Sequence, residues 1–213
     1  MTDLADRILD AALPAIVFDG WTMATLEKAA ESIGLTAFDA KRAFPNGAAD
    51  AVARFSARAD EQMLASLTAD HDLSKMKIRE RIATCVLVRL GQNTPHREAV
   101  RRALGFYALP WNALAGLSAL YATVDAMWRA AGDTSTDYNF YTKRALLSAV
   151  FTSTVRVWLD DTSEDLADTE AFLRRRVENV MEIEKAKAKL RDGFGKLEEW
   201  LPPFMKNSGQ FQG

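Results

Sequence analysis

Apolar residues recur at the three- and four-residue spacing of an α-helix along almost the whole chain, while alternating β-branched runs bounded by turn residues are missing. This periodicity predicts an all-α fold. Because 48% of the 213 residues are hydrophobic, the chain is also long enough to bury a sizeable core. In the segment 112–131 the pattern forms one continuous apolar stripe of Leu114, Leu117, Leu120, Val124 and Met127.

Helix-breaking and helix-capping residues divide this pattern into segments. Pro14 is expected to end or kink the first helix, and Thr162-Ser163-Glu164-Asp165 has the form of a capping box for the last. The predicted helices cover residues 3–13, 25–33, 37–43, 48–68, 74–91, 94–108, 112–131 and 135–160, and a ninth helix begins behind the capping box.

Three short helices with a glycine turn between the second and third are typical of a helix-turn-helix. We therefore expect a helix-turn-helix-like unit over residues 1–47, a bundle of longer helices over 48–192 and an amphipathic tail over 193–213. The spacing of Gly20-Trp21, Gly34-Leu35 and Phe44-Pro45 resembles the domain of TetR-type repressors. A TetR-type, ligand-responsive transcription regulator is thus one candidate function.

The charge of this unit argues against DNA binding. Residues 1–50 carry four basic and eight acidic side chains, a net charge of −4, and Asp39 falls inside the predicted recognition helix. Because neutralisation of phosphates by Lys and Arg supplies most non-specific affinity for DNA, such a unit repels the backbone that it would have to approach. We predict no nucleic-acid partner.

No motif in the sequence nominates an active site. His71 and His96 lie in polar links, and neither has an acidic residue three positions before it, so a helical Glu-x-x-His metal site is absent. A Gly-x-Ser-x-Gly elbow and a phosphate-binding glycine loop are also missing. The single cysteine, Cys85, has the apolar neighbours of a buried, inert thiol. We predict a protein that is not an enzyme and that has no cofactor.

The two ends of the chain bear on its location. The N-terminus has the form of neither a secretory signal nor an Arg-rich transit peptide, and no apolar run approaches about 18 residues, which predicts a cytoplasmic protein. At the other end, aromatic and aliphatic residues follow a basic segment, a composition typical of an interfacial membrane anchor. The predicted membrane-binding residues are Phe194, Leu197, Trp200, Leu201, Phe204 and Met205.

Aromatic and charged residues are concentrated between residues 125 and 144, on both sides of a break that begins at Gly132. Aromatic residues mixed with Arg have the composition of a protein-binding hot spot. Trp and Tyr are also frequent core residues, so an ordinary buried turn is the alternative interpretation.

The helical order, this turn and the tail together resemble the ubiquinone (coenzyme Q) biosynthesis lipid-binding proteins, a family with a TetR-like fold. The segments that carry the resemblance include 124–128, 131–137, 141–142, 144–145 and several positions between Trp158 and Leu173. The resemblance implies a non-enzymatic accessory protein that binds isoprenoid lipid or phospholipid. It also implies service to the di-iron hydroxylase that acts on demethoxyubiquinone.

The family uses a surface patch at the turn to bind this hydroxylase. Phe140 stands where a Trp is common in the family, and Ala126 where a second acidic residue is common. Tyr141→Ala or Arg144→Glu is expected to weaken hydroxylase binding with little loss of fold. Carried over by position, the partner-binding patch consists of Asp125, Met127, Trp128, Asp137, Phe140, Tyr141 and Arg144.

An apolar pocket between the long helices would hold the lipid, because ligand sites in helical bundles are built between facing helices. The candidate lining residues are Leu90, Leu114, Leu117, Leu120, Phe151, Val155, Trp158, Leu173 and Val177. The tail would keep the protein peripheral on the inner face of a membrane. A homodimer is expected, since two-fold symmetry is the commonest arrangement of soluble oligomers.

Overall fold

The computed structural model describes residues 3–134, 138–180 and 182, with the side chains of 138 and 139 excepted. Helices, turns and links account for these residues, and no strand occurs among them, so the predicted all-α class is confirmed. Residues 1–173 form one compact unit, which contains the sites described below. Of the second unit, which begins at Arg174, residues 174–180 and 182 are helical.

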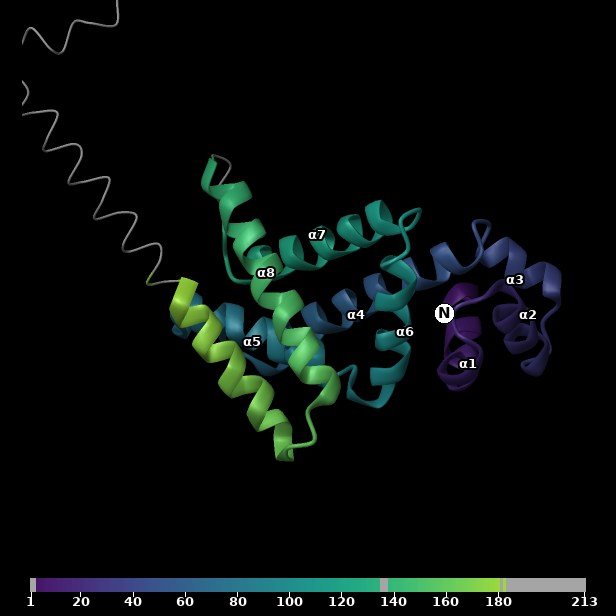
Figure 1. Cartoon of the computed structure of the whole chain (residues 1–213), viewed down its shortest axis with the longest axis horizontal. Coiled ribbons are helices and arrows are strands. Elements are labelled where there is room, and N and C mark those ends of the chain that lie inside the picture. The colour runs from purple at the N-terminus through teal and green to yellow at the C-terminus, as the bar shows by residue number, and fades with distance from the viewer. Residues whose placement is uncertain (1–2, 135–137, 181, 183–213) are drawn as a thin grey trace, which may run out of the picture. The chain divides into compact units, whose positions relative to one another are not determined.

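The first unit opens with the helices of the N-terminal part and continues with those of the bundle (Figure 1). The N-terminal helices are α1 (Leu4–Asp19), α2 (Met23–Ser32) and α3 (Ala37–Ala43). The bundle helices are α4 (Ala48–Asp70), α5 (Ile78–Gly91), α6 (Arg97–Tyr107), α7 (Ala113–Ala130) and α8 (Tyr138–Asp160). Three single 3-10 turns, η1 (Leu73–Lys75), η2 (Thr94–His96) and η3 (Glu164–Leu166), stand in the links, and residues 167–180 are helical after η3.

Pro14 does not end the first helix, which continues to Asp19. The buried face formed by Ile8, Leu9 and Leu13 extends past the proline to Ile16, so packing outweighs the lost backbone hydrogen bond. The helix ends at Gly20, whose positive φ of 73° is a conformation that glycine adopts without strain.

The core of α1–α3 is continuous with α4 and α6. Ile8, Ile16 and Phe44 pack in one buried cluster that also contains Val52 of α4 and Ala99 of α6. Trp21 Nε1 donates a hydrogen bond of 3.1 Å to the carbonyl of Ala99, and its ring lies 5.3 Å from that of Phe55. The N-terminal unit is therefore fixed to the bundle through shared side chains.

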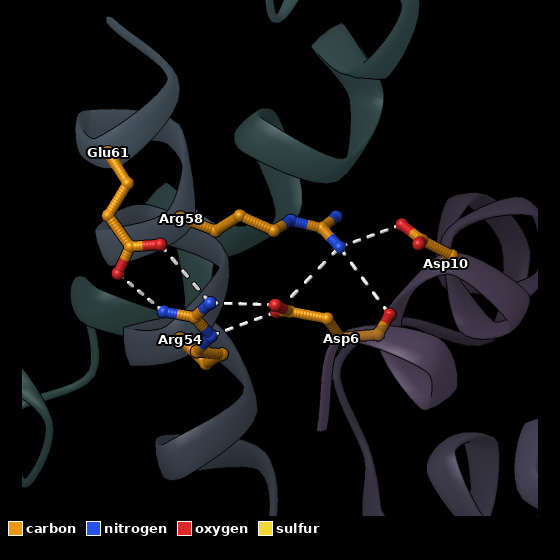
Figure 2. Close-up of polar contacts among 5 residues, drawn as sticks. All are labelled: Asp6, Asp10, Arg54, Arg58 and Glu61. Atoms are coloured by element: carbon orange, nitrogen blue, oxygen red, sulfur yellow. Dashed lines mark hydrogen bonds and ion pairs between the residues drawn. The ribbon is translucent and has the colours of Figure 1, made fainter. Parts of the chain in front are cut away.

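Ion pairs join the same elements at the surface of this core (Figure 2). Arg54 donates to both carboxylate oxygens of Asp6, at 2.9 and 2.7 Å, and also pairs with Glu61 at 2.7 Å. Arg58 pairs with Asp10 at 2.7 Å. The hydrogen bond from Arg54 is the main reason that the pKa of Asp6 lies below its ordinary value. These contacts hold α1 against α4.

The helix that follows α8 is not started by the expected Thr162 to Asp165 capping box. Asp161 accepts hydrogen bonds from the Ser163 amide at 2.8 Å and from the Thr169 amide at 2.9 Å, while Asp165 and Leu166 have positive φ. Burial alone would raise the pKa of Asp161, but the bonds from Ser163 and Thr169 outweigh it and lower the pKa to about 2. A buried carboxylate one residue before the expected cap thus organises the start of this helix.

Candidate functional site

Helices α4 to α8 of the first unit surround an apolar pocket. Its volume of about 580 Å³ falls within the range of ~300–1,000 Å³ that ligand pockets span. Five helices contribute walls, represented by Val52 of α4, Leu90 of α5, Leu104 of α6, Leu120 of α7 and Phe151 of α8. Leu104 is also partly exposed to solvent, so the pocket opens to the surface between α6 and α7.

Six of the nine predicted lining residues take part in this pocket. Leu114 is exposed, Leu173 is fully buried and Val177 belongs to the second unit, and the lining includes none of these three. The six that line the pocket are Leu90, Leu117, Leu120, Phe151, Val155 and Trp158.

A buried charge pair lies at one wall of the pocket, and the sequence patterns did not predict it. Arg89 Nε donates to Asp60 Oδ1 at 2.7 Å, and the Thr123 hydroxyl donates to Asp60 Oδ2 at 2.8 Å. Arg89 and Thr123 both line the pocket. Burial raises the pKa of Asp60, while Arg89 acts in the opposite direction. The charges neutralise each other, so the apolar cavity remains free of net charge at this wall.

Two other pocket residues carry polar atoms without a partner. The Tyr107 hydroxyl and Trp158 Nε1 are buried, and neither has a hydrogen-bond partner among the described residues. The Arg97 guanidinium lies 5.3 Å from the centre of the Trp158 ring. Burial raises the pKa of Tyr107. Unsatisfied buried polar atoms are uncommon in folded proteins, so each of these two donors calls for a partner, which a water or a bound molecule would supply.

α7 approaches α6 closely beside Tyr107. A Cβ atom at Gly116 would lie 2.8 Å from the Cβ of Tyr107, a separation that real structures do not show. Gly116 therefore permits the close packing of α7 on α6 at Tyr107, and both residues belong to the pocket lining.

The turn between α7 and α8 contains a cluster of buried charges. Arg144 is only 3% exposed and contacts Asp125 at 2.6 Å and Asp133 at 3.3 Å. Its guanidinium lies 3.4 Å from the centre of the Phe140 ring. Lys143 pairs with Asp133 at 2.7 Å. Arg144 is thus a structural side chain beneath the turn, and its substitution is expected to disturb the fold, in contrast to the expectation from sequence.

Tyr141 is the most exposed of the described patch residues, at 67%. Its ring stands edge-on against Phe140 at 5.1 Å, and Phe140 in turn is supported by Arg144. Trp128 Nε1 donates to the Lys143 carbonyl at 3.1 Å, and Met127 is fully buried. An aromatic side chain is therefore presented to solvent on a rigid base of ion pairs.

Some predicted site residues lie outside the described residues. These are Asp137 of the patch and the six predicted membrane-binding residues Phe194, Leu197, Trp200, Leu201, Phe204 and Met205. Cys85, by contrast, lies in α5 and is buried, as predicted, and burial raises the pKa of its thiol to about 11.

The third helix, which would read DNA in a helix-turn-helix, has its cations engaged within the protein. Lys41 pairs with Glu27 at 3.1 Å and Arg42 pairs with Asp39 at 3.1 Å. Asp39 also accepts from the Thr36 amide and hydroxyl, and this capping box holds its pKa below the ordinary value. Asp39 therefore caps the N-terminus of this helix.

No group of three or more His, Cys, Asp or Glu side chains in the described part of the chain could hold a metal ion. Within the same residues, none of the helices combines the length and the apolar character needed to cross a bilayer.

Comparison with solved structures shows the fold. The chain resembles a TetR transcriptional regulator from Nitrosomonas europaea with a TM-score of 0.66, over 82% of this chain and 95% of that one. Only 18% of the aligned residues are identical, so this likeness concerns architecture and not activity. The predicted TetR-like fold is confirmed.

Sequence comparison leads to one family. The mitochondrial ubiquinone biosynthesis protein COQ9 of Homo sapiens is 34% identical over 84% of this chain, and COQ9-B of Xenopus laevis is 35% identical over 84%. The probable ubiquinone biosynthesis protein coq9 of Dictyostelium discoideum is 25% identical over 91%. The chain spans about three fifths of the length of these relatives, namely 58%, 62% and 64%. All three are named as mitochondrial proteins of ubiquinone biosynthesis.

The model of the COQ9 family matches residues 113–184, which include α7, the turn with Tyr141, and α8. This range therefore contains both the described patch residues and one side of the pocket. The resemblance drawn from the sequence is confirmed: the COQ9 family model matches residues 113–184, and the chain is similar to the COQ9 ubiquinone biosynthesis proteins over most of its length.

Proposed function

We propose that this protein is a non-enzymatic, lipid-binding accessory protein of ubiquinone biosynthesis. It takes up an isoprenoid quinone intermediate and presents it to the demethoxyubiquinone hydroxylase. The observation that carries the proposal is the apolar pocket of about 580 Å³ among α4 to α8, in a chain related to COQ9 proteins.

The pocket supports this function because an isoprenoid tail cannot leave a bilayer unaided. Each buried CH₂ group contributes roughly 0.8 kcal/mol, so one isoprene unit of five carbons contributes roughly 4 kcal/mol. Leu90, Leu120 and Phe151 would replace those lipid contacts with protein contacts. The balanced pair of Asp60 and Arg89 lets a neutral molecule enter without meeting an uncompensated charge.

The unpartnered atoms of the pocket suit the polar end of a quinone. Tyr107 and Trp158 each carry a buried donor, and quinone or methoxy oxygens are acceptors. A bound head group that accepted from either donor would remove an unsatisfied polar atom from the interior. A saturated hydrocarbon would not provide that compensation.

The Tyr141 surface would position the hydroxylase. An exposed aromatic side chain on a rigid base has the character of an interface hot spot, because little side-chain entropy is lost on binding. The tail over 193–213 would hold the protein on the inner face of a membrane, and two copies would associate as a homodimer. Light scattering of the purified protein would measure that oligomeric state.

Extraction with organic solvent followed by mass spectrometry tests the carrier function. Wild-type protein should release an isoprenoid quinone or a phospholipid, and Leu120→Trp, which fills the pocket, should release severalfold less. Leu64→Trp is the control, because Leu64 lies on α4 and does not line the pocket. Repeatedly empty wild-type preparations from a lipid-rich host would refute the carrier function. Equal lipid content in the two variants would show that the lipid is not bound in this pocket.

A further inference from the structure

An exposed apolar surface surrounds the junction of α6 and α7. Trp111 is 76% exposed and Leu114 is 81% exposed, and both adjoin the start of α7. The surface, here called the α6–α7 apolar face, consists of Leu104, Leu109, Trp111, Leu114, Leu117 and Tyr121.

The sequence of this region lacks the side chains that normally keep a surface helix in water. Residues 103–124 contain no Asp, Glu, Lys or Arg, although 56 of the 213 residues in the chain are charged in this way. On α7, Leu114, Leu117 and Tyr121 follow the i, i+3, i+7 spacing of one helix face, and all three are exposed. A helix face without charge is ordinarily covered, so this one is built to meet an apolar surface.

The position of the pocket indicates which surface that is. Leu104 and Leu117 belong both to the apolar face and to the pocket lining, so the face forms the rim of the pocket opening. Arg156 of α8 lines the same pocket and is exposed to solvent, so it supplies a cation suited to lipid phosphate. Tryptophan and tyrosine beside leucine are the residues that settle at a membrane interface.

The hydroxylase is less suited to this face, because its proposed docking residue lies at the opposite end of α7. Tyr141 follows the C-terminal end of that helix, whereas Trp111 precedes its N-terminal end. A helix of 18 residues is about 27 Å long. The two surfaces can therefore be occupied at once, one by a protein and one by lipid.

We propose that the α6–α7 apolar face inserts into the surface of a lipid bilayer and brings the pocket opening into contact with the acyl chains. The choice of a bilayer as the occupant rests on the proposed lipid-binding function. In this arrangement an isoprenoid tail passes from the bilayer into the pocket along Leu104 and Leu117 without crossing water. The face is a second membrane contact, separate from the predicted contact through the tail.

A polarity-sensitive fluorophore at one engineered cysteine tests this insertion in the full chain. Leu114→Cys places the fluorophore on the face, and Phe38→Cys is the control on α3, with the original side chain 71% exposed. Cys85 is buried and will not compete for the label. With vesicles of phosphatidylcholine and phosphatidylglycerol, emission at position 114 should shift to the blue and be quenched by nitroxide-labelled lipid, while emission at position 38 should not change.

Vesicle flotation gives an independent measure. Leu114→Asp should weaken vesicle binding by about tenfold, because a charge replaces a leucine that enters the bilayer, whereas Phe38→Asp should bind like wild type. Flotation without any spectral shift at position 114 would overturn the proposal. A blue shift that depends on protein concentration and needs no vesicles would also overturn it, since a second copy of the chain would then cover the face.

The outcome is separable from that of the proposed function. If purified protein yields no isoprenoid or phospholipid but position 114 still inserts, the carrier function fails and the membrane face stands. If lipid is recovered and position 114 remains in water, the carrier function stands and the membrane face fails.

Discussion

Replacing Arg144 with alanine is expected to destabilise the protein by about 3 kcal/mol, because it removes a buried cation shared by the carboxylates of Asp125 and Asp133. The guanidinium contacts Asp125 at 2.6 Å and Asp133 at 3.3 Å, and at 3% exposure it has almost no contact with solvent. Breaking a buried ion pair ordinarily costs ~3–5 kcal/mol. The lower end applies here, because Arg129 and Lys143 still pair with the two carboxylates, each at 2.7 Å.

Urea unfolding followed by far-ultraviolet circular dichroism measures this loss. Arg129→Ala is the matched control, because Arg129 pairs with the same Asp125 but is 73% exposed, and a surface pair contributes about 0–1 kcal/mol. A loss for Arg144→Ala no larger than that for Arg129→Ala would refute the interpretation that Arg144 is a buried structural cation. Any weakening of hydroxylase binding in Arg144→Ala is then an indirect effect of a disturbed turn.

Three further predictions concern separate features of the chain. Tyr141→Ala should weaken co-purification with the hydroxylase about tenfold or more. Because the ring is exposed, the free energy of unfolding should change by less than about 0.5 kcal/mol. Unchanged co-purification would show that Tyr141 is not part of the interface. The pKa of Asp161 is about 2 in the folded state and about 3.9 in the unfolded state. The ionised Asp161 therefore stabilises the fold above about pH 4, and this contribution is lost as the pH falls through 2. Asp161→Asn should therefore lower the free energy of unfolding at pH 7 by about 1–3 kcal/mol and reduce the change of the urea midpoint between pH 4 and 2. A variant whose urea midpoint depends on pH as the wild type's does would contradict this. A gel-shift titration at low salt should show no retarded DNA, since residues 1–50 carry a net charge of −4, and retardation there would favour the regulator.

The helical architecture could be predicted from sequence because it depends on local signals. The segment 37–43 has the predicted bounds, since Thr36 and Asp39 form a capping box within four residues. Pro14 was misleading because a long-range effect, burial of Ile16 in the shared core, decides whether α1 continues. The last helix start was misplaced for a similar reason, as Asp161 reaches eight residues along the chain to Thr169.

The candidate site shows the same division between local and distant effects. The stripe through Leu117 and Leu120 placed two pocket residues correctly on one helix, because periodicity reports which residues share a face. Sequence spacing could not reveal that Asp60 contacts Arg89 and Thr123, because the three residues come from three different helices. Nor could it show that Arg144 lies beneath the turn, because a charged residue is expected at the surface until its partners are known.

The sharing of side chains between α1 and α6 determines how far the chain can be shortened. Ala99 and Ala103 of α6 belong to the core of the N-terminal unit, and Ala103, Leu104 and Tyr107 on the same helix line the pocket. A fragment that begins after Gly47 would expose the rear of α6 and release the helix that forms one pocket wall. The smallest fragment that keeps the pocket intact therefore includes α1 to α3, which pack against α6 in the shared core.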